Sequence, residues 1–132
     1  DASIDEALEE SYDMVVLAGG LPGADNLDKD QRIHDVLKKL NNAGKFVAAI
    51  CAAPKILANA GLLDGKKATS YPGFLEIENR PEVKSTGSPL EIDGNIVTSR
   101  GPGTALDFAL QLVELLEGKE KREEVEARLQ RP

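Results

Sequence analysis

The sequence predicts an α/β fold, a mainly parallel β-sheet with helices on its faces. Two apolar runs, residues 13–18 and 46–50, have the length of buried strands, and each precedes a segment with helical character. Two strand–helix units in succession are typical of a parallel sheet. The Asp93-Gly94 pair between two further apolar segments is a strong hairpin signal. Residues 1–132, which contain no repeat or linker, are expected to form one domain.

The first expected element is a helix that begins near Ser3, because Ser3 and Glu6 have the spacing of a capping box. The first strand then leads into a glycine-rich loop at residues 19–23. Either Asp28 or Asp30 is expected to cap the next helix. The apolar positions of this helix follow helical spacing: Ile33, Val36, Leu37 and Leu40.

After the second strand, the sequence predicts a turn at Cys51 and a short helix that stops near Gly61. Residues 67–70 are expected to form a short strand that ends at the same edge of the sheet. Residues 74–80 are expected to form a helix, broken by Pro81.

Two strands and two helices are expected in the last third of the chain. The hairpin strands are residues 90–92 and 95–98. A helix over residues 104–117 is apolar on several faces, which predicts that it is well buried, and a charged helix over residues 120–129 follows.

The net charge of −7 argues against a general nucleic-acid or anionic-membrane surface, because phosphate groups would repel it. A single cysteine forms no internal disulfide, which fits a reducing compartment. No apolar run is long enough to span a bilayer and no signal-peptide pattern is present, so a cytoplasmic protein is expected.

Cys51 lies where the second strand gives way to Ala52, Ala53 and Pro54. Pro54 favours the first turn of a helix, since its missing N–H has no helical partner there. The thiol is therefore expected beside free N–H groups that stabilise the nucleophilic thiolate. A lone cysteine after a buried strand can also be inert packing. The two alanines and the proline favour the functional interpretation, because they leave room for a small substrate.

The Gly19-Gly20 loop is expected close to Cys51, since ligands of parallel sheets collect at the carboxyl ends of the strands. The backbone N–H groups of Gly20 and Ala52 can then converge on an oxyanion near the sulfur. The alternative is that the glycine pair forms only a tight turn.

Three further side chains are candidates around Cys51. His34 is expected on the surface rather than as a catalytic base, and Tyr71, followed by Pro72, either lines the pocket or serves only packing. Arg100 either offers its cation to an anion or pairs with an acidic side chain. No carboxylate lies obviously beside Cys51. One cysteine and one histidine far apart do not have metal-ligand spacing, so no metal is expected.

Three motifs in this order resemble the ThiJ/PfpI superfamily, in particular the branch of the parkinsonism-associated protein and its bacterial relatives. They are Leu17-Ala18-Gly19-Gly20 with Gly23-Ala24, Ala48-Ala49-Ile50-Cys51-Ala52-Ala53-Pro54, and Thr98-Ser99-Arg100-Gly101-Pro102-Gly103-Thr104. The resemblance runs from Asp1 to about Glu124. The protease-like branch has a histidine directly after the cysteine, where this chain has Ala52, which counts against a peptidase.

The resemblance implies a flavodoxin-like, three-layer α/β sandwich that forms a homodimer. It implies a reactive Cys51 that oxidises to a sulfinic acid, with backbone amides of Gly19, Gly20 and Ala52 around it, and no cofactor. The implied activities are conversion of methylglyoxal or glyoxal to hydroxy acids, repair of early glycation adducts, and redox-regulated chaperone action under oxidative stress.

Two departures from the family pattern follow. The chain begins at Asp1, and its only methionine is Met14, which is typical of a fragment, a processed chain or a trimmed chain. The resemblance implies that the first strands of the sheet, and a protonated glutamate that hydrogen-bonds the cysteine, precede this chain or come from a separate N-terminal fragment. Many members also carry histidine where Tyr71 stands, which weakens a Cys–His dyad.

Three interpretations of function remain. The first is a cysteine-dependent enzyme of glyoxalase or deglycase type, whose partner is a small aldehyde or dicarbonyl. The second is a redox-sensing or chaperone-like protein in which Cys51 is oxidised without turnover. The third is an inert structural fragment.

Overall fold

The computed structural model describes residues 3–8, 11–20, 23–75 and 80–131. In chain order its elements are α1 (Ile4–Leu8), β1 (Met14–Leu17), α2 (Gly23–Asp28), α3 (Gln31–Asn42), β2 (Phe46–Ile50), α4 (Pro54–Asn59), β3 (Lys67–Ala68), β4 (Lys84–Ser85), β5 (Leu90–Asp93), β6 (Ile96–Ser99), the 3₁₀ turn η1 (Pro102–Thr104), α5 (Ala105–Glu117) and α6 (Lys119–Leu129).

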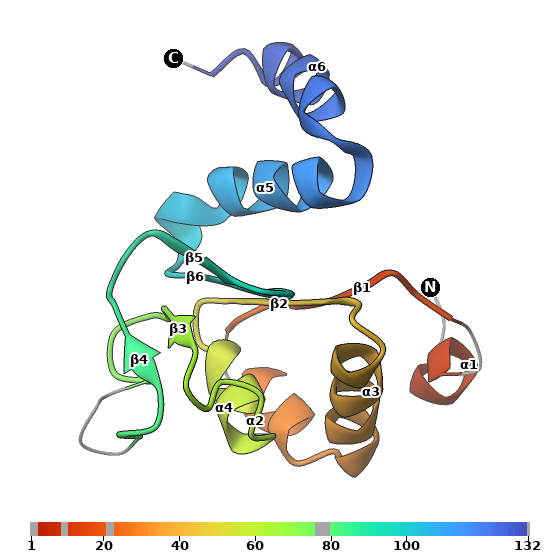
Figure 1. Cartoon of the computed structure of the whole chain (residues 1–132), viewed down its shortest axis with the longest axis vertical. Helices are drawn as coiled ribbons and strands as arrows, with labels where there is room; N and C mark the ends of the chain where they lie inside the picture. The colour runs from red at the N-terminus through yellow and green to blue at the C-terminus, as the bar shows by residue number, and fades with distance from the viewer. Residues whose placement is uncertain (1–2, 9–10, 21–22, 76–79, 132) are drawn as a thin grey trace.

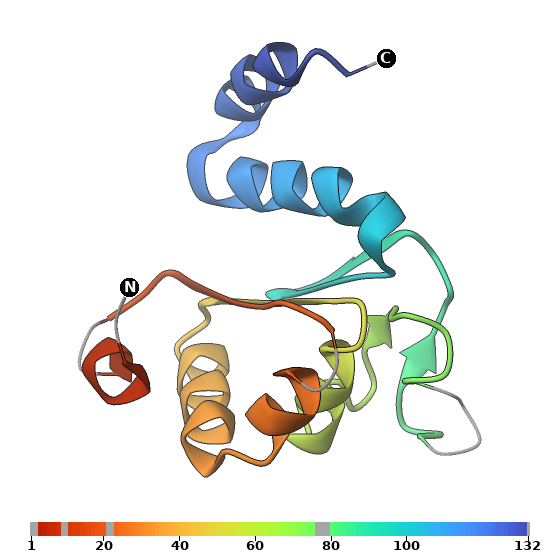
Figure 2. The ribbon, with the colours of Figure 1, turned by 180° about the vertical axis from the view of Figure 1, so that it is seen from behind.

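The main sheet has the strand order β1-β2-β6-β5. The first three strands in that order are parallel, and β5 runs antiparallel to β6. Helix α5 covers one face of the sheet, while α2, α3 and α4 lie on the other, as Figures 1 and 2 show from opposite sides. This arrangement confirms the predicted α/β fold with a mainly parallel sheet and three layers.

The core lies on both sides of β2. Val47, Ala48 and Ala49 have no exposed surface, because β2 is central and both of its faces are covered. The larger cluster joins the sheet to α3 and α4 through buried aliphatic side chains, whereas Phe108 of α5 closes a smaller cluster on the other face. This burial on both faces explains why the β2 sequence is continuously apolar rather than alternating.

The predicted helix starts are confirmed where local chemistry decides them. The amide of Glu6 donates to the Ser3 hydroxyl at 3.2 Å, which caps α1. Asp30, not Asp28, caps α3, and its carboxylate accepts a hydrogen bond from the Arg32 amide at 3.0 Å. Pro54 occupies the first turn of α4, as expected.

Three predictions require correction. Helix α2 was not expected, since six residues behind a glycine-rich loop carry too little periodicity to predict a helix. Residues 67–70 do not join the main sheet: only Lys67–Ala68 is a strand, and it pairs with β4 in a separate two-stranded sheet. The reason is that β5 already occupies the edge of β6. Thr69 reaches β6 by one bond instead, from its amide to the Thr98 hydroxyl at 3.0 Å.

The third correction concerns α5, which is buried on one side only. Phe108 and Leu110 are buried, but Leu106 and Leu116 are about half exposed. The predicted hairpin is confirmed, although its two loop residues are Gly94 and Asn95, since Asp93 still pairs with Ile96. The expected helix over residues 74–80 falls largely on residues 76–79, which lie outside the described residues.

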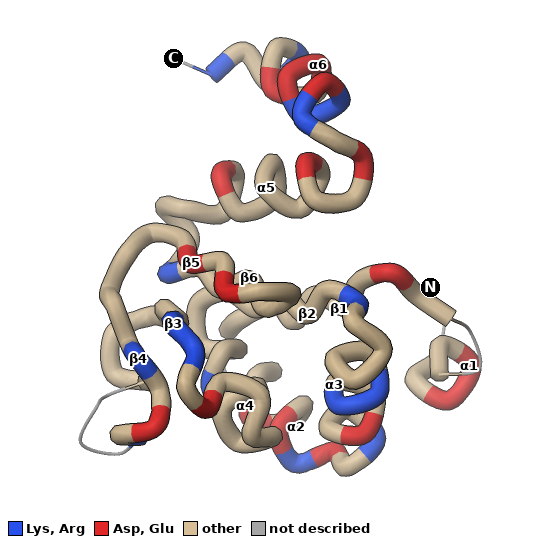
Figure 3. Tube along the Cα trace, in the orientation of Figure 1, with Lys and Arg blue, Asp and Glu red and all other residues tan. Residues whose placement is uncertain are grey.

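The C-terminal charged helix is confirmed as α6, which packs beyond α5, away from the sheet (Figure 1). None of its residues is buried, and acidic and basic residues are interspersed along its length (Figure 3). Within the described parts of the chain, no helix combines the length and apolar character needed to cross a membrane.

Candidate functional site

Cys51 occupies a strained turn between β2 and α4. Its φ angle is 66°, in the left-handed region that residues with a side chain rarely adopt. Two backbone hydrogen bonds hold it there: the Cys51 amide donates to the Ser99 carbonyl at 3.0 Å, and the Tyr71 amide donates to the Cys51 carbonyl at 2.7 Å. Such strain costs on the order of 1–3 kcal/mol and is concentrated at functional sites.

The glycine loop lies directly against this turn. A side-chain Cβ at Gly19 would be 2.5 Å from the Cβ of Cys51 and 2.8 Å from the Ile50 carbonyl oxygen, so only glycine fits. The next residue, Gly20, has a φ of 97°, which glycine adopts without steric cost. Gly19 therefore lies against Cys51, and Gly20 follows it in the chain.

The amides of Gly20 and Ala52 are available to a ligand. Neither has a hydrogen-bond partner among the described residues, although Ala52 is only 2% exposed. Buried backbone N–H groups without partners are rare in folded proteins, so the Ala52 amide is the unusual one, whereas Gly20 is exposed. Both amides are free to donate a hydrogen bond to an anionic oxygen.

The thiol itself has no polar partner in the described parts of the chain. No hydrogen bond or ion pair there involves the Cys51 sulfur, which is partly exposed and is the chain's one free cysteine. The described residues thus bring no carboxylate into hydrogen-bond contact with the sulfur. They also contain no cluster of three or more histidine, cysteine, aspartate or glutamate side chains that could hold a metal ion.

A cavity of about 320 Å³ lies beside the cysteine turn, lined by Tyr71, Pro72 and residues 100–104. The structure therefore brings together Tyr71, Pro72 and Arg100, the three pocket candidates from the sequence. Cys51 itself is not among the lining residues. The Tyr71 ring is 48% exposed, and a Cβ at Gly101 would lie 3.4 Å from it.

The structure tests one of the two sequence interpretations of Arg100, its pairing with an acidic side chain. Its Nη1 donates to the carbonyl of Gly87 at 2.9 Å, and it pairs with no acidic side chain among the described residues. Its loop is shaped by hydroxyls: Ser99 Oγ lies 2.7 Å from Thr104 Oγ1, which also accepts from the Gly101 amide at 3.1 Å.

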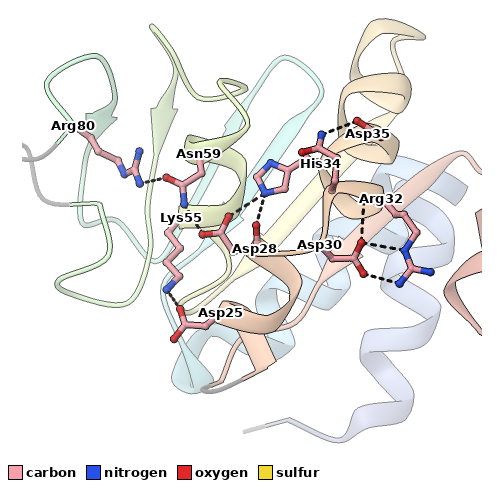
Figure 4. Close-up of polar contacts among 10 residues, drawn as sticks. Asp25, Asp28, Asp30, Arg32, His34, Asp35, Lys55, Asn59 and Arg80 are labelled. Atoms are coloured by element: carbon pink, nitrogen blue, oxygen red, sulfur yellow. Dashed lines mark hydrogen bonds and ion pairs between the residues drawn. The ribbon is translucent and has the colours of Figure 1, made fainter.

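Sequence reasoning missed two residues, Lys55 and Asp25, which link the helices α4 and α2. Lys55 of α4 forms an ion pair with Asp25 of α2, as Figure 4 shows. Its Nζ also lies 5.4 Å from the centre of the Phe74 ring, which meets Tyr71 edge-on with 6.4 Å between ring centres. No sequence spacing pairs residue 25 with residue 55, so only the fold brings these side chains together.

His34 lies apart from the cysteine turn, as predicted. It sits on α3, where its Nε2 is 2.7 Å from the Asp28 carbonyl oxygen and 3.1 Å from the Asp28 carboxylate (Figure 4). Only 14% of its side chain is exposed, so it is more buried than the sequence suggested. His34 acts here as a link between α2 and α3.

The fold and the site together define a class: three-layer α/β proteins with a cysteine at a strained strand–helix turn and a glycine loop packed against it. The model of the DJ-1/PfpI family matches residues 1–115. The chain belongs to the DJ-1/PfpI family.

Several relatives carry the same likeness. The chain is 44% identical over 126 residues to protein DJ-1 homolog A of Arabidopsis thaliana, covering 95% of this chain and 32% of that protein. It is 41% identical to protein dj-1beta of Drosophila melanogaster, covering 95% and 67%. The crystal structure of that fly protein has a TM-score of 0.89 at 39% identity, covering 96% of this chain and 68% of the other. The oxidized DJ-1 of Toxoplasma gondii has a TM-score of 0.86 at 36% identity, covering 96% and 68%. The chain thus spans about a third of the plant relative and about two thirds of the others.

Proposed function

We propose that Cys51 is the nucleophile of a cofactor-free reaction on small reactive dicarbonyls, of glyoxalase or deglycase type. The observation that carries this proposal is the left-handed Cys51 turn with the unpartnered amides of Gly20 and Ala52 beside it. Such amides stabilise an oxyanion where charge develops, which is a large contribution to catalysis of carbonyl chemistry.

The reaction begins when the Cys51 thiolate adds to the aldehyde carbon of methylglyoxal, which forms a C–S bond and an alkoxide. The alkoxide accepts hydrogen bonds from the two amides. A base then moves the proton from that carbon to its neighbour, which converts the hemithioacetal into a thioester. Water cleaves the C–S bond and releases lactate and the thiol, so the balance is one methylglyoxal and one water to one lactic acid.

The base is the part of this reaction that the described residues do not supply. No carboxylate there contacts the thiol, and the resemblance assigns the role to a glutamate that precedes this chain. We propose that this group comes from a separate N-terminal fragment or a further segment, and that the assembled protein is a homodimer.

The test is methylglyoxal loss with lactate formation, measured for the complete protein, with the segment that supplies the base, and for its Cys51→Ser variant. We expect both rates to fall to the uncatalysed level in the variant. Equal rates would exclude Cys51 as the nucleophile. Mass spectrometry after hydride reduction adds a direct check, because it should detect a dicarbonyl adduct on the Cys51 peptide of the wild type only.

A redox-sensing or chaperone-like role is the second candidate, and the oxidized state of the Toxoplasma relative favours it. Two peroxide molecules would convert the Cys51 thiolate to a sulfinate and leave two water molecules, and the same two amides can bind the sulfinate oxygens. Intact mass after mild peroxide should show two added oxygens. Peptide mapping must place them on Cys51, since Met14 can take up one oxygen itself. A thiol that stays unmodified would rule out this role.

A further inference from the structure

We propose that the cavity beside Cys51 binds a carboxylate of the substrate through Arg100. The preferred substrates would then be α-oxoaldehydes with a second, anionic end. The inference rests on the proposed function and adds a substrate class to it. It is carried by the position of the cavity, its size and the environment of Arg100.

Backbone hydrogen bonds to Cys51 link both walls of the cavity to the cysteine turn. One wall is Tyr71-Pro72, and the Tyr71 amide donates to the Cys51 carbonyl. The other wall is the loop of residues 100–104, which follows directly after Ser99, the acceptor for the Cys51 amide. Each wall therefore begins within one residue of a direct backbone bond to Cys51, which places the cavity beside the cysteine turn.

The cavity is larger than the smallest dicarbonyls need. Its volume is about 320 Å³. A water molecule takes about 30 Å³ in the liquid, so methylglyoxal, with its five non-hydrogen atoms, would fill roughly half of the space or less. A substrate with a longer chain behind its ketone uses the remaining volume.

Arg100 gives the cavity its chemistry, since it is the one charged residue of the lining. Four of the chain's six arginines form ion pairs with carboxylates: Arg32, Arg122, Arg128 and Arg131. Arg100 instead donates from Nη1 to the Gly87 carbonyl, which fixes the guanidinium, and its other N–H groups have no partner among the described residues. A fixed guanidinium with open donors suits a planar carboxylate, which it can bind through two parallel hydrogen bonds.

The charge of the whole chain makes the local cation necessary. A net charge of −7 repels anions in general, so an anionic substrate needs the Arg100 cation to bind, whereas a neutral dicarbonyl does not. A suitable probe is 4,5-dioxopentanoate. Its aldehyde carbon is oxidised to the acid and its ketone carbon is reduced to the alcohol, so that one water is added, 2-hydroxyglutarate is released and no external oxidant is needed.

The first experiment compares kcat/KM for 4,5-dioxopentanoate with kcat/KM for methylglyoxal. We expect the wild type to prefer the anionic substrate, and Arg100→Ala to lower that preference about tenfold to a hundredfold, mainly through KM, as for loss of a charged hydrogen bond. Arg100→Lys should keep part of the preference. Arg128→Ala on the exposed helix α6 is the matched control and should leave both substrates unaffected. An unchanged ratio in Arg100→Ala would overturn the proposal.

A second pair of variants leaves Arg100 in place. A Cβ at Gly103 has no heavy atom within 4 Å, so Gly103→Asp and Gly103→Asn can both be accommodated. The aspartate places a negative charge at the cavity and should reduce the preference for the anionic substrate at least threefold more than the asparagine, whose shape is the same. Equal effects of the two variants would contradict an anion site.

Binding separates this proposal from the proposed function. In the Cys51→Ser background, which removes the nucleophile, NMR titration with 2-hydroxyglutarate should shift the amide signals of the non-proline residues of the 100–104 loop, and lactate should not. If neither dicarbonyl is converted but 2-hydroxyglutarate binds and Arg100→Ala abolishes that binding, the proposed reaction fails and the anion site stands. The opposite outcome has two parts: methylglyoxal is converted, and 2-hydroxyglutarate either does not bind or binds equally well with Arg100 and with Arg100→Ala. In that case the reaction stands and the anion site is wrong.

Discussion

At the scale of single residues, the site depends on one close contact and on several buried polar groups. The backbone of Gly19 touches the Cys51 turn, and the left-handed φ of Cys51 is held by the bonds to Ser99 and Tyr71. On the neighbouring strand β6, Thr98 accepts a bond from the Thr69 amide, while the buried hydroxyl of Thr69 has no partner among the described residues. Each of these contacts leads to a prediction about stability.

Gly19→Ala should destabilise the chain. The new methyl group would lie 2.5 Å from the Cys51 Cβ, so the turn must move, and such overpacking costs about 1–3 kcal/mol. The measurement is the free energy of unfolding in urea. Gly23→Ala is the control, since a Cβ there meets no atom within 4 Å and should be neutral or stabilising by about 0.4–1 kcal/mol. Equal effects of the two substitutions would show that the Cys51 turn can relax.

Thr69→Val and Thr98→Val should change the free energy of unfolding differently, either in sign or in size. Valine at position 69 removes a buried hydroxyl that has no partner, so we expect a neutral change or a gain of about 1 kcal/mol. Valine at position 98 removes the acceptor of the Thr69 amide, which should cost about 1–3 kcal/mol. Urea unfolding of both variants tests this, and a large loss in Thr69→Val would mean that its hydroxyl has a partner in solution.

At the scale of elements, α3 is the best defined unit, because its N-terminus is both capped and paired. Asp30 accepts from the Arg32 amide and from the Arg32 guanidinium, which also donates to Asp5 of α1. The hydrogen bond from the Arg32 side chain lowers the pKa of Asp30, while burial opposes the shift, and the same pairing raises the pKa of Arg32. The Arg32 side chain therefore joins the cap of α3 to α1.

This cap should make stability depend on pH. The folded pKa of Asp30 lies below its unfolded value of about 3.9, so the ionised cap stabilises the fold above that pH. The contribution is lost as the pH falls through the lower, folded pKa. Asp30→Asn keeps a cap without the titration, so the wild type should be more stable at pH 7 and the difference should vanish at low pH.

The measurement is the free energy of unfolding against pH for both proteins. In an Arg32→Gln background the pH-dependent difference should shrink, since the main cause of the pKa shift is gone. A difference that is the same at all pH values would show that the two caps differ in hydrogen bonding rather than in charge.

At the scale of the whole molecule, the edge of the sheet at β1 is unpaired within the described residues. Strand β1 is at the end of the strand order, and within the described residues it pairs with β2 alone. Val16 of β1 is 47% exposed, and Leu106 and Leu116 of α5, the helix that covers one face of the sheet, are about half exposed. A groove of about 320 Å³ between α1 and α3 runs along the other side of this edge, lined in part by Leu8, Tyr12 and Val36.

Val16→Thr should therefore cost the isolated chain little, no more than about 0.5 kcal/mol, because the side chain already meets solvent. Val47→Thr on the central strand is the control. It buries a hydroxyl at a fully covered position and should cost about 1–3 kcal/mol. Urea unfolding compares the two, and sedimentation gives the oligomeric state. An equal cost at position 16 would mean that a second copy or another segment covers this edge in solution.

Local patterns predicted most of the elements because local chemistry decides them. The cap at Ser3, the proline at the start of α4 and the apolar run of β2 each act within a few residues, so the sequence alone locates them. The site was predicted in part for the same reason, since Cys51 follows β2 directly. The position of Tyr71 was predicted from a strand in the main sheet that does not exist there; its amide reaches Cys51 from a turn instead.

By itself, the sequence determined the α/β class, the strand–helix turn that carries Cys51 and the family to which the chain belongs. Only the tertiary structure decided the left-handed conformation of Cys51, the contact with Gly19, the ion pair of Lys55 with Asp25 and the bond from Arg100 to Gly87. The physical reason is the separation along the chain of the residues that interact. Caps and apolar runs act between neighbours along the chain, whereas these contacts join segments whose approach is set by the packing of the whole sheet and its helices.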